Sequence, residues 1–496
     1  MKASLDHVAR TALTATLAVA LAACGGGGPS APPPTGGTPT PTPPVSTCSV
    51  ANQIAFADDV LNEWYLFPDL LDDTVDPDDF DNVQDFLDAR VAPAADALFD
   101  RGFTFATSIA EENEAIRSGG TAGIGVRLGY DVANRRVFIL EAYENAPGFQ
   151  AGLDRGSELL AIGTSSSNLQ TVSELFAQGG AQAVVNALGP SQSGVTRVIR
   201  FRQIDGDVIE RSISKTEFEL DPISDRNGVR IFEEGGRKIG YLNLRTFIVG
   251  TADRQLVEAF QRFSDEGVTE FVFDFRYNGG GLVRIAGVLG DLLRGPNTGE
   301  VFSRTLYRDS KSDRNQTRRF MDTVRLQIPG TDNFEDPIAI PRVNPEKVAF
   351  ITTRATASAS ELVINSLLPY VDEDNIAIIG EDTSGKPVGQ GGFDFEECDL
   401  RIRAVTFETV NADGQGRYFE GLAELVPNTC RAFDDISNPL GSREEDSIMT
   451  ALDFLAGRSC TPFVGQTSIT GQSVGGRRVL QPERPNAIQH ENPGLF

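Results

Sequence analysis

The sequence predicts a multidomain protein of mixed α/β and α+β class, and three patterns along its 496 residues carry that prediction. Apolar residues recur at three- and four-residue steps between 48 and 118, which is typical of amphipathic helices. Short apolar runs separated by turn residues fill 119–218 and indicate a small β domain. From 219 to 460, apolar strands alternate with helices, as in parallel sheets with right-handed crossovers.

The first 23 residues indicate an exported protein. They open with basic residues, continue in a short apolar run and end in Leu21-Ala22-Ala23-Cys24. This layout is typical of a signal peptide rather than a membrane span. The ending also resembles a bacterial lipobox, so we expect Cys24 to be lipidated on the periplasmic side of a cell-envelope membrane, preferably the outer one. Simple secretion is the alternative. Residues 24–47, rich in Gly, Pro and Thr, indicate an extended linker.

Charge restricts the possible partners. The chain carries 70 Asp and Glu against 44 Lys and Arg, a formal net charge of −26. A surface this acidic disfavours nucleic acid and anionic lipid headgroups, so we expect membrane contact through the lipid anchor alone. No cysteine or histidine spacing is typical of a zinc site, and the sequence predicts neither a metal nor a cofactor.

Four cysteines remain once Cys24 is acylated, and an even number in an exported chain favours disulfides over free thiols. Cys48 and Cys460 lie at the two ends of the folded region, whereas Cys398 and Cys430 lie within one segment. We therefore expect the bridges Cys48–Cys460 and Cys398–Cys430, although the sequence permits other pairings.

The stretch from Val348 to Leu368 carries the candidate nucleophile. An apolar strand is followed by a turn of small residues and by Ser358 between two alanines, at the start of a helix. The alanines leave the Ser358 hydroxyl unshielded, and the free N–H groups of the helix start point where an oxyanion would form. The alternative is an ordinary helix N-cap serine.

A lysine is the candidate base. The two histidines, His7 and His490, fall in the leader and in a polar tail, so we do not expect a Ser-His-Asp triad. Lysine can replace histidine when burial leaves its amine neutral. Lys386 lies in a glycine-bounded loop after the apolar strand Ile376–Ile379. The alternative is a lysine on a surface loop.

Together these residues resemble the carboxy-terminal processing peptidases, also called tail-specific proteases. The matching pattern is Ser358-Ala359-Ser360-Glu361 followed by Gly385-Lys386 and by Gln390. The resemblance implies that Ser358 is the nucleophile, Lys386 the general base and Gln390 the hydrogen-bonding partner of the lysine. Asp372-Glu373-Asp374 make the Ser-to-Lys interval slightly longer than is usual, and an insertion in a surface connection costs little.

A glycine loop also fits this family. Asp274-Phe275-Arg276-Tyr277-Asn278-Gly279-Gly280-Gly281 joins an apolar strand to the helix Leu282–Leu293. The resemblance implies that the N–H groups of Gly280 and Ala359 are the oxyanion donors, although Tyr277 and Gly279 depart from the common form of the motif. It also implies a crotonase-like ββα-spiral protease core over 219–460.

Residues 119–218 resemble a PDZ domain. Gly123-Ile124-Gly125-Val126 matches the loop whose N–H groups bind a terminal carboxylate, and the strand that follows would accept a peptide as an added strand. Asp205-Gly206 lies between two apolar strands and predicts a hairpin. The alternative is a small β domain that binds no peptide.

The resemblance extends from Ile54 to Ala456 and implies a serine endopeptidase, which the leader and Cys24 predict to be exported and lipid-anchored. Its PDZ domain would capture unstructured or C-terminally presented segments of protein substrates, which Ser358 would cleave. One alternative is a non-catalytic, peptide-binding lipoprotein of the same architecture, and another is an acyl-CoA enzyme with the same core. Ser358, Lys386 and Gln390 together disfavour the first, and the leader disfavours the second. Residues 461–496, rich in Gly, Ser, Arg and Pro, predict a disordered tail.

Overall fold

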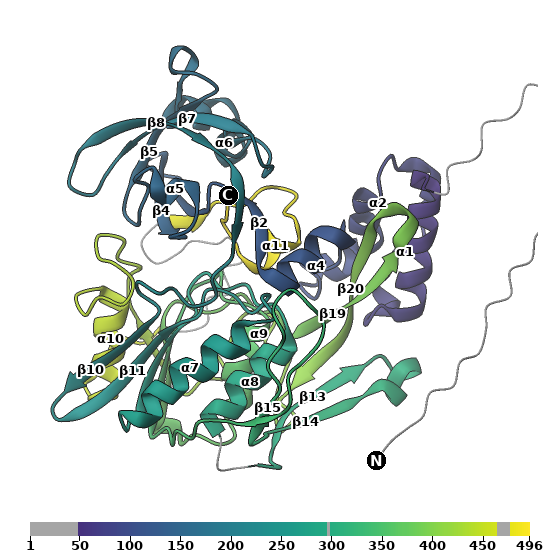
Figure 1. The fold of residues 1–496 in the computed structure, drawn as a ribbon. Helices are drawn as coiled ribbons and strands as arrows, with labels where there is room; N and C mark the ends of the chain where they lie inside the picture. The colour runs from purple at the N-terminus through teal and green to yellow at the C-terminus, as the bar shows by residue number, and fades with distance from the viewer. Residues whose placement is uncertain (1–47, 295–297, 464–476) are drawn as a thin grey trace, which may run out of the picture. The chain divides into compact units, whose positions relative to one another are not determined.

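A six-stranded sheet organises the largest part of the molecule (Figure 1). The structure, a computed structural model, describes residues 48–294, 298–463 and 477–496. The expected signal peptide, the lipidation site Cys24 and the linker up to residue 47 lie outside these ranges. No helix within the described ranges is long and apolar enough to cross a membrane.

The central sheet is mostly parallel. Its order is β10-β11-β12-β17-β18-β21, and only β10 and β11 pair antiparallel. Every residue of β12 and β18 is buried, as expected where helices cover both faces of a parallel sheet. The strands are β10 (Val229–Glu234), β11 (Arg237–Asn243), β12 (Glu270–Asp274), β17 (Lys347–Thr352), β18 (Ile376–Gly380) and β21 (Asn428–Arg431).

The two faces of this sheet carry different helices. Alternate side chains of β12 point to opposite faces, so Phe271 and Phe273 join one apolar cluster and Val272 joins another. The first cluster includes α7 (Ala252–Asp265), α8 (Val283–Arg294) and α9 (Ala359–Leu367). The second lies under α10 (Asp446–Leu455) (Figure 1). Because β12, β17 and β18 are parallel, the loops after them meet at one edge of the sheet.

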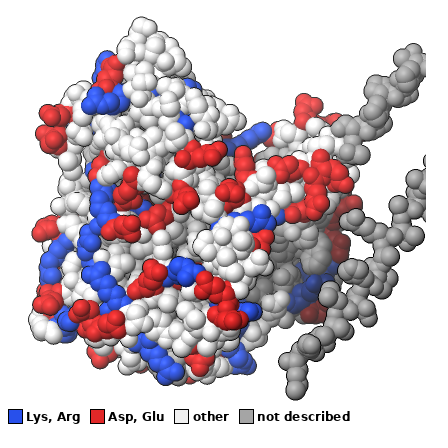
Figure 2. All heavy atoms as spheres, in the orientation of Figure 1, with Lys and Arg blue, Asp and Glu red and all other residues white. Residues whose placement is uncertain are grey.

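The N-terminal region is helical and packs on a second sheet. Its four α-helices are α1 (Val50–Trp64), α2 (Val83–Arg90), α3 (Ala92–Asp96) and α4 (Ile109–Ser118). The second sheet has the order β1-β20-β13-β14, with β19 paired to β20. The strands are β1 (Phe105–Ser108), β13 (Val301–Tyr307), β14 (Gln316–Arg319), β19 (Val388–Phe395) and β20 (Leu400–Val410). Acidic side chains gather over this helical region on the face drawn in Figure 2.

Residues 120–219 form a β domain that we call the small sheet domain. Its sheet has the order β22-β3-β4-β5-β7-β8, with β6 paired to β5, and α6 (Val172–Leu188) packs against it. A short pair, β2 (Gly120–Gly123) and β9 (Thr216–Glu219), closes the domain. The other strands are β3 (Val126–Asp131), β4 (Arg136–Ala142), β5 (Glu158–Gly163), β6 (Gln170–Thr171), β7 (Thr196–Arg202), β8 (Val208–Ser214) and, from the C-terminal segment, β22 (Arg477–Val479).

The expectation of a disordered tail over 461–496 is wrong for its last part. Residues 477–496 contain β22 and the short helix α11 (Ala487–Glu491), drawn in yellow in Figure 1. Leu480, Leu495 and Phe496 are buried. They belong to two short apolar pairs, Val479-Leu480 and Leu495-Phe496, which are too short to show a periodic pattern. Leu480, Leu495 and Phe496 each join an apolar cluster elsewhere in the fold.

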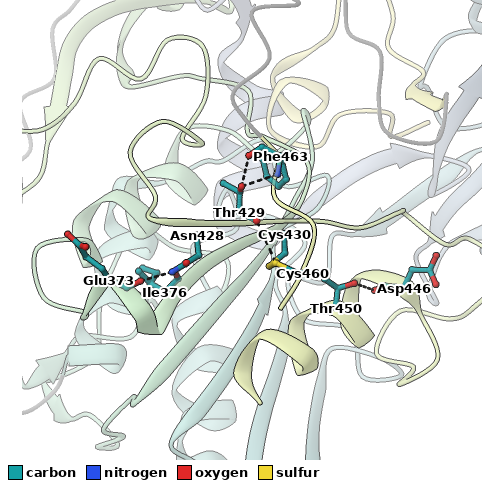
Figure 3. Close-up of a disulfide and its surroundings, with 9 residues drawn as sticks. All are labelled: Glu373, Ile376, Asn428, Thr429, Cys430, Asp446, Thr450, Cys460 and Phe463. Atoms are coloured by element: carbon teal, nitrogen blue, oxygen red, sulfur yellow. Dashed lines mark hydrogen bonds between the residues drawn. A yellow bond between two sulfur atoms is a disulfide. The ribbon is translucent and has the colours of Figure 1, made fainter. Parts of the chain in front are cut away.

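The four cysteines are paired, but the expected connectivity is wrong. Cys48 is bonded to Cys398, with Cα atoms 5.1 Å apart, and Cys430 to Cys460, with Cα atoms 5.4 Å apart. Cys398 precedes β20, against which α1 packs, so it meets the start of α1. Cys430 lies in β21, and Cys460 follows α10, which covers that edge of the sheet (Figure 3).

Candidate active site

Ser358 lies at the turn between β17 and α9, where its backbone is strained. Its φ is +54° and its ψ −113°, a conformation that non-glycine residues rarely adopt. Strain of this kind costs roughly 1–3 kcal/mol and persists only where the surrounding structure enforces it. The turn thereby holds the half-buried serine at the carboxyl edge of the central sheet.

A buried carboxylate ties this turn to the loop that carries Lys386. Glu361 accepts hydrogen bonds from the main-chain N–H groups of Ser358 (2.8 Å), Gly385 (2.7 Å) and Lys386 (2.8 Å). Burial raises the pKa of Glu361, and these hydrogen bonds oppose part of the rise. The sequence contains a signal for the first contact, because Ser-x-x-Glu before an apolar run is a capping box. Nothing in the sequence indicates that the same carboxylate also holds the second loop.

Lys386 is buried, with 6% of its surface exposed. Its Nζ lies 5.1 Å from the centre of the Phe103 ring and 4.0 Å from Glu491 Oε1. Gln390, expected to orient the lysine, donates instead to the carbonyl of Phe103 (2.8 Å), and no hydrogen bond within the described residues joins Gln390 to Lys386. Gln390 therefore binds the main chain of Phe103, the residue whose ring lies beside the lysine.

The glycine loop packs directly on the serine turn. A Cβ added to Gly280 would lie 2.7 Å from Ser358 Cβ and 3.1 Å from Ala359 N, and Gly280 has φ +119°. The carbonyl of Asn278 accepts from Ala357 N–H (3.1 Å) and from the Ser360 hydroxyl (3.1 Å), which fixes the two loops together. Only glycine fits at position 280.

The two expected oxyanion donors differ in their hydrogen bonds. The described residues provide no acceptor for the N–H of Ala359, which leaves it open. The N–H of Gly280 donates to Asn278 Oδ1 (3.0 Å), whereas the N–H of Gly279 donates to the carbonyl of Glu491 (3.0 Å). In this structure Gly279, rather than Gly280, is the glycine whose N–H donates to a main-chain carbonyl of another segment.

His490, which the sequence places in a remote tail, lies beside this centre. Its ring stacks on Phe105 with centroids 3.9 Å apart and planes 13° apart. Burial, with a further contribution from Lys386, lowers the pKa of His490 to about 3. Asp372 and Asp374, which lengthen the interval between Ser358 and Lys386, lie in an exposed turn before β18, so they are at the opposite end of the strands from both residues.

The glycine loop is anchored to both the core and the small sheet domain. Arg276 is buried and forms ion pairs with Asp274 (2.9 Å) and Glu445 (2.7 Å). Arg155 of the small sheet domain pairs with Asp434 of the core (2.7 Å), and Asp434 also pairs with Arg276 (3.1 Å). The small sheet domain is thus fixed to the residues that support the candidate site.

The expected peptide-binding loop of the small sheet domain is occupied. The N–H groups of Ile124 (3.0 Å), Gly125 (2.7 Å) and Val126 (3.4 Å) converge on one main-chain oxygen of Phe496, the last residue of the sequence. Gly125 has φ +68°, and a Cβ there would lie 2.0 Å from Ala146 Cβ, so this loop conformation requires glycine. The carbonyl of Val126 accepts from Phe496 N–H (3.0 Å), as it would from an added strand.

A cavity of about 1020 Å³ adjoins Lys386. Its lining comes from the helical N-terminal region, the core loops and the C-terminal segment, and includes Phe103, Ala357, Lys386, His490 and Pro493. A space of this size holds an organic ligand or several residues of peptide. Among the described residues, no group of three His, Cys, Asp or Glu side chains is placed to bind a metal ion.

Comparisons with known proteins agree with this architecture. Residues 238–424 match the family model described as peptidase family S41, and residues 52–105 match the model described as the peptidase S41 N-terminal domain. A carboxyl-terminal-processing protease of Picosynechococcus sp. is 24% identical over 298 residues, which is 59% of this chain and 61% of that protein. A protease of the same name from Synechocystis sp. is 21% identical over 341 residues, covering 68% of this chain and 70% of that protein.

A solved structure shares the fold. The crystal structure of a putative S41 protease from Bacteroides fragilis superposes with a TM-score of 0.58 at 21% identity, covering 81% of this chain and 97% of that one. The alignment with the first relative spans only about three fifths of its length. The likeness to the solved structure shows the mixed α/β fold, and the site residues rest on the geometry described above.

Proposed function

We propose, on the premise that this chain carries both domains of peptidase family S41, that it is a serine endopeptidase with a Ser358–Lys386 dyad. The relatives named carboxyl-terminal-processing protease support a serine peptidase that acts on proteins or peptides. The observation that carries the dyad is Glu361, whose single carboxylate binds the N–H groups of both Ser358 and Lys386. A structural carboxylate shared by these two loops fixes the nucleophile and the base relative to each other.

In the proposed reaction, the Ser358 Oγ attacks the carbonyl carbon of the substrate while its proton moves to a neutral Lys386 Nζ. The N–H of Ala359 and an N–H of the glycine loop donate to the resulting oxyanion. Lys386 then gives the proton to the departing amine, which leaves an acyl-enzyme. A water molecule, deprotonated by the same lysine, hydrolyses this ester, so that a new carboxyl terminus is released and Ser358 is restored.

The surroundings of Lys386 hold its side chain in place. The proposed reaction requires the amine in its neutral form, because only that form accepts a proton. Lys386 lies against the Phe103 ring and is almost fully buried. Gln390 contributes to this arrangement by holding the Phe103 carbonyl.

We infer that the small sheet domain is a PDZ domain that captures the carboxyl end of the substrate. Three N–H groups that converge on one oxygen suit a carboxylate, which accepts more hydrogen bonds than a peptide carbonyl. The edge of β3 would then pair with the residues that precede the bound end. We further propose that Cys24 is lipidated, which would tether the enzyme to the periplasmic side of a bacterial membrane.

Mass spectrometry of the products from an unfolded protein substrate tests the proposed activity. Internal cleavage by the parent and none by the Ser358→Ala variant is expected, with Ser437→Ala, an exposed serine, as the matched control. A protein that binds the substrate but leaves it intact would instead be a binding protein with an idle dyad, and the peptidase proposal would fail.

A further inference from the structure

The C-terminal segment, residues 477–496, lies along the edge of β3 at its two ends, and the residues between them do not. β22 pairs antiparallel with β3, Val479 opposite Gly129. After Leu480 the chain departs, and it returns at Gly494, whose carbonyl accepts from Leu128 N–H (2.9 Å). The edge that would receive a substrate strand is therefore occupied at both ends by residues 477–480 and 494–496 of the same chain.

The part between, residues 481–493, reaches the candidate catalytic centre. The position that a Cβ on Gly280 would take lies 2.7 Å from Ser358 Cβ, 3.1 Å from Ala359 N and 3.0 Å from Glu491 Oε2. Three groups thus surround one point: the candidate nucleophile, the open N–H and the carboxylate of Glu491. Its other oxygen is 4.0 Å from Lys386 Nζ, and Oε2 is buried without a hydrogen-bond partner among the described residues.

This segment is not held as a substrate would be. α11 is helical, with hydrogen bonds from His490 N–H to Asn486 O (3.0 Å) and from Asn492 N–H to Ile488 O (2.8 Å), whereas added-strand binding requires extended chain. The group beside Lys386 is a side-chain carboxylate, which has no amine to expel. Glu491 lies between Ser358, the open N–H of Ala359 and Lys386, where the carbonyl of a substrate would have to bind, so the docked state is inactive.

The contacts of Phe496 indicate which kind of residue the loop of the small sheet domain accepts. Phe496 is 3% exposed and lies in the apolar cluster of the small sheet domain with Ile124 and Val126, whereas Leu495 enters a separate cluster with Tyr143. A charged side chain in place of Phe496 would be buried there without a partner. The position next to the three converging N–H groups therefore selects a large apolar residue.

We propose that residues 477–496 are an intramolecular inhibitor of this enzyme, and that a polypeptide bound at the same loop and β3 edge displaces them. The inhibitory half rests on the proposed peptidase function, whereas the ligand half rests on binding alone. A tethered end has an effective concentration on the order of mM, so a free chain end competes against it only when abundant or when it engages further contacts.

The test uses a fluorescein-labelled peptide with the sequence of residues 492–496 and a free carboxylate, and measures its binding to the full chain by fluorescence anisotropy. Phe496→Asp places a charge in the apolar cluster and should expel the end. We expect this variant to bind the peptide about tenfold tighter or more than the parent, because the tethered competitor is gone. The same peptide with a C-terminal amide should bind neither protein well. Phe433→Asp, at an exposed phenylalanine, is the matched control.

Hydrolysis of an unfolded protein gives the second measurement. Phe496→Asp should cleave it faster than the parent, and Glu491→Gln should also cleave it faster while binding the labelled peptide as the parent does. Glu483→Gln, exposed on the same segment, is the control. If Phe496→Asp does not fold, a second variant takes its place in both measurements. It carries Gly-Ser-Asp appended after Phe496, which moves the terminal carboxylate out of the loop.

The outcomes separate the two proposals. Peptide binding that is no tighter in Phe496→Asp, or equal binding of the amide, overturns the ligand assignment. Equal cleavage by the parent and both variants overturns the inhibitor and supports the peptidase. Tighter peptide binding with no cleavage by any variant supports the ligand assignment and overturns the peptidase function together with the inhibition that depends on it.

Discussion

Replacing Gly280 by alanine tests whether the glycine loop must contact the serine turn. The added Cβ would lie 2.7 Å from Ser358 Cβ, and carbon atoms in ordinary contact are about 3.5 Å apart, so one of the two must move by about 0.8 Å. A misplacement of this order at a reacting group lowers the rate roughly 10²-fold, equivalent to about 2.7 kcal/mol of barrier. The φ of +119° adds strain of roughly 1–3 kcal/mol to the folded state.

The assay is kcat/KM on an unfolded protein substrate together with the free energy of unfolding. Gly267→Ala is the matched control, because Gly267 has φ +66° and open space around its Cβ position. It should lose stability from strain alone and keep its activity. Both variants are measured in the Phe496→Asp background. In the parent, the added Cβ at position 280 would also displace Glu491, and the resulting release of inhibition would hide the loss of activity. Parental kcat/KM in Gly280→Ala, or an equal loss in Gly267→Ala, would refute the reasoning.

Three further predictions concern the anchor, a disulfide and pH. Cys24→Ser should move the protein from the membrane to the soluble fraction with unchanged activity; retention in the membrane fraction would exclude this lipid anchor. Replacing Cys430 and Cys460 by serine should lower the free energy of unfolding by about 2–4 kcal/mol, and unchanged denaturant midpoints would contradict it. In the docked segment the pKa of His490 is lowered from 6.5 to about 3, so a proton binds the undocked histidine more tightly. The equilibrium constant for docking should therefore be highest above pH 6.5 and fall by about tenfold at pH 5.5. Burial raises the pKa of Glu491, which opposes this trend. The comparison of parent with His490→Gln at pH 7.5 and 5.5, by labelled-peptide binding, isolates the histidine contribution, and equal pH dependence in both would contradict it.

Local pattern predicted much of the core because each element there carries its own signal. The apolar strand expected before the glycine loop is β12 (Glu270–Asp274), and the expected strand Ile376–Ile379 is β18 (Ile376–Gly380). Both are buried on two faces, so their apolar character is continuous. Parallel pairing then brings the loops after these strands to one edge, which is why residues far apart in sequence, such as Ser358 and Lys386, could be expected together.

What the sequence did not reveal depends on contacts between distant, isolated residues. The cysteine pairing follows from where α1 and α10 pack, and spacing along the chain carries no information on that. Leu480 and Phe496 each belong to an isolated apolar pair, Val479-Leu480 and Leu495-Phe496, so no periodicity marks the segment that docks on β3. Gln390 was assigned to Lys386 by resemblance, whereas its side chain contacts Phe103.

The central claim is that Ser358 and Lys386 form the catalytic dyad, and hydrolysis by the Lys386 variants tests it most directly. Lys386→Ala and Lys386→Arg should each lose nearly all cleavage of an unfolded protein, as Ser358→Ala should, because guanidinium stays charged and members of a catalytic unit fail together. Lys238→Ala, at a surface lysine paired with Glu266, should cleave like the parent. All four variants are measured in both the parent and the Phe496→Asp chains. Cleavage by Lys386→Ala at close to the rate of its background would contradict the dyad.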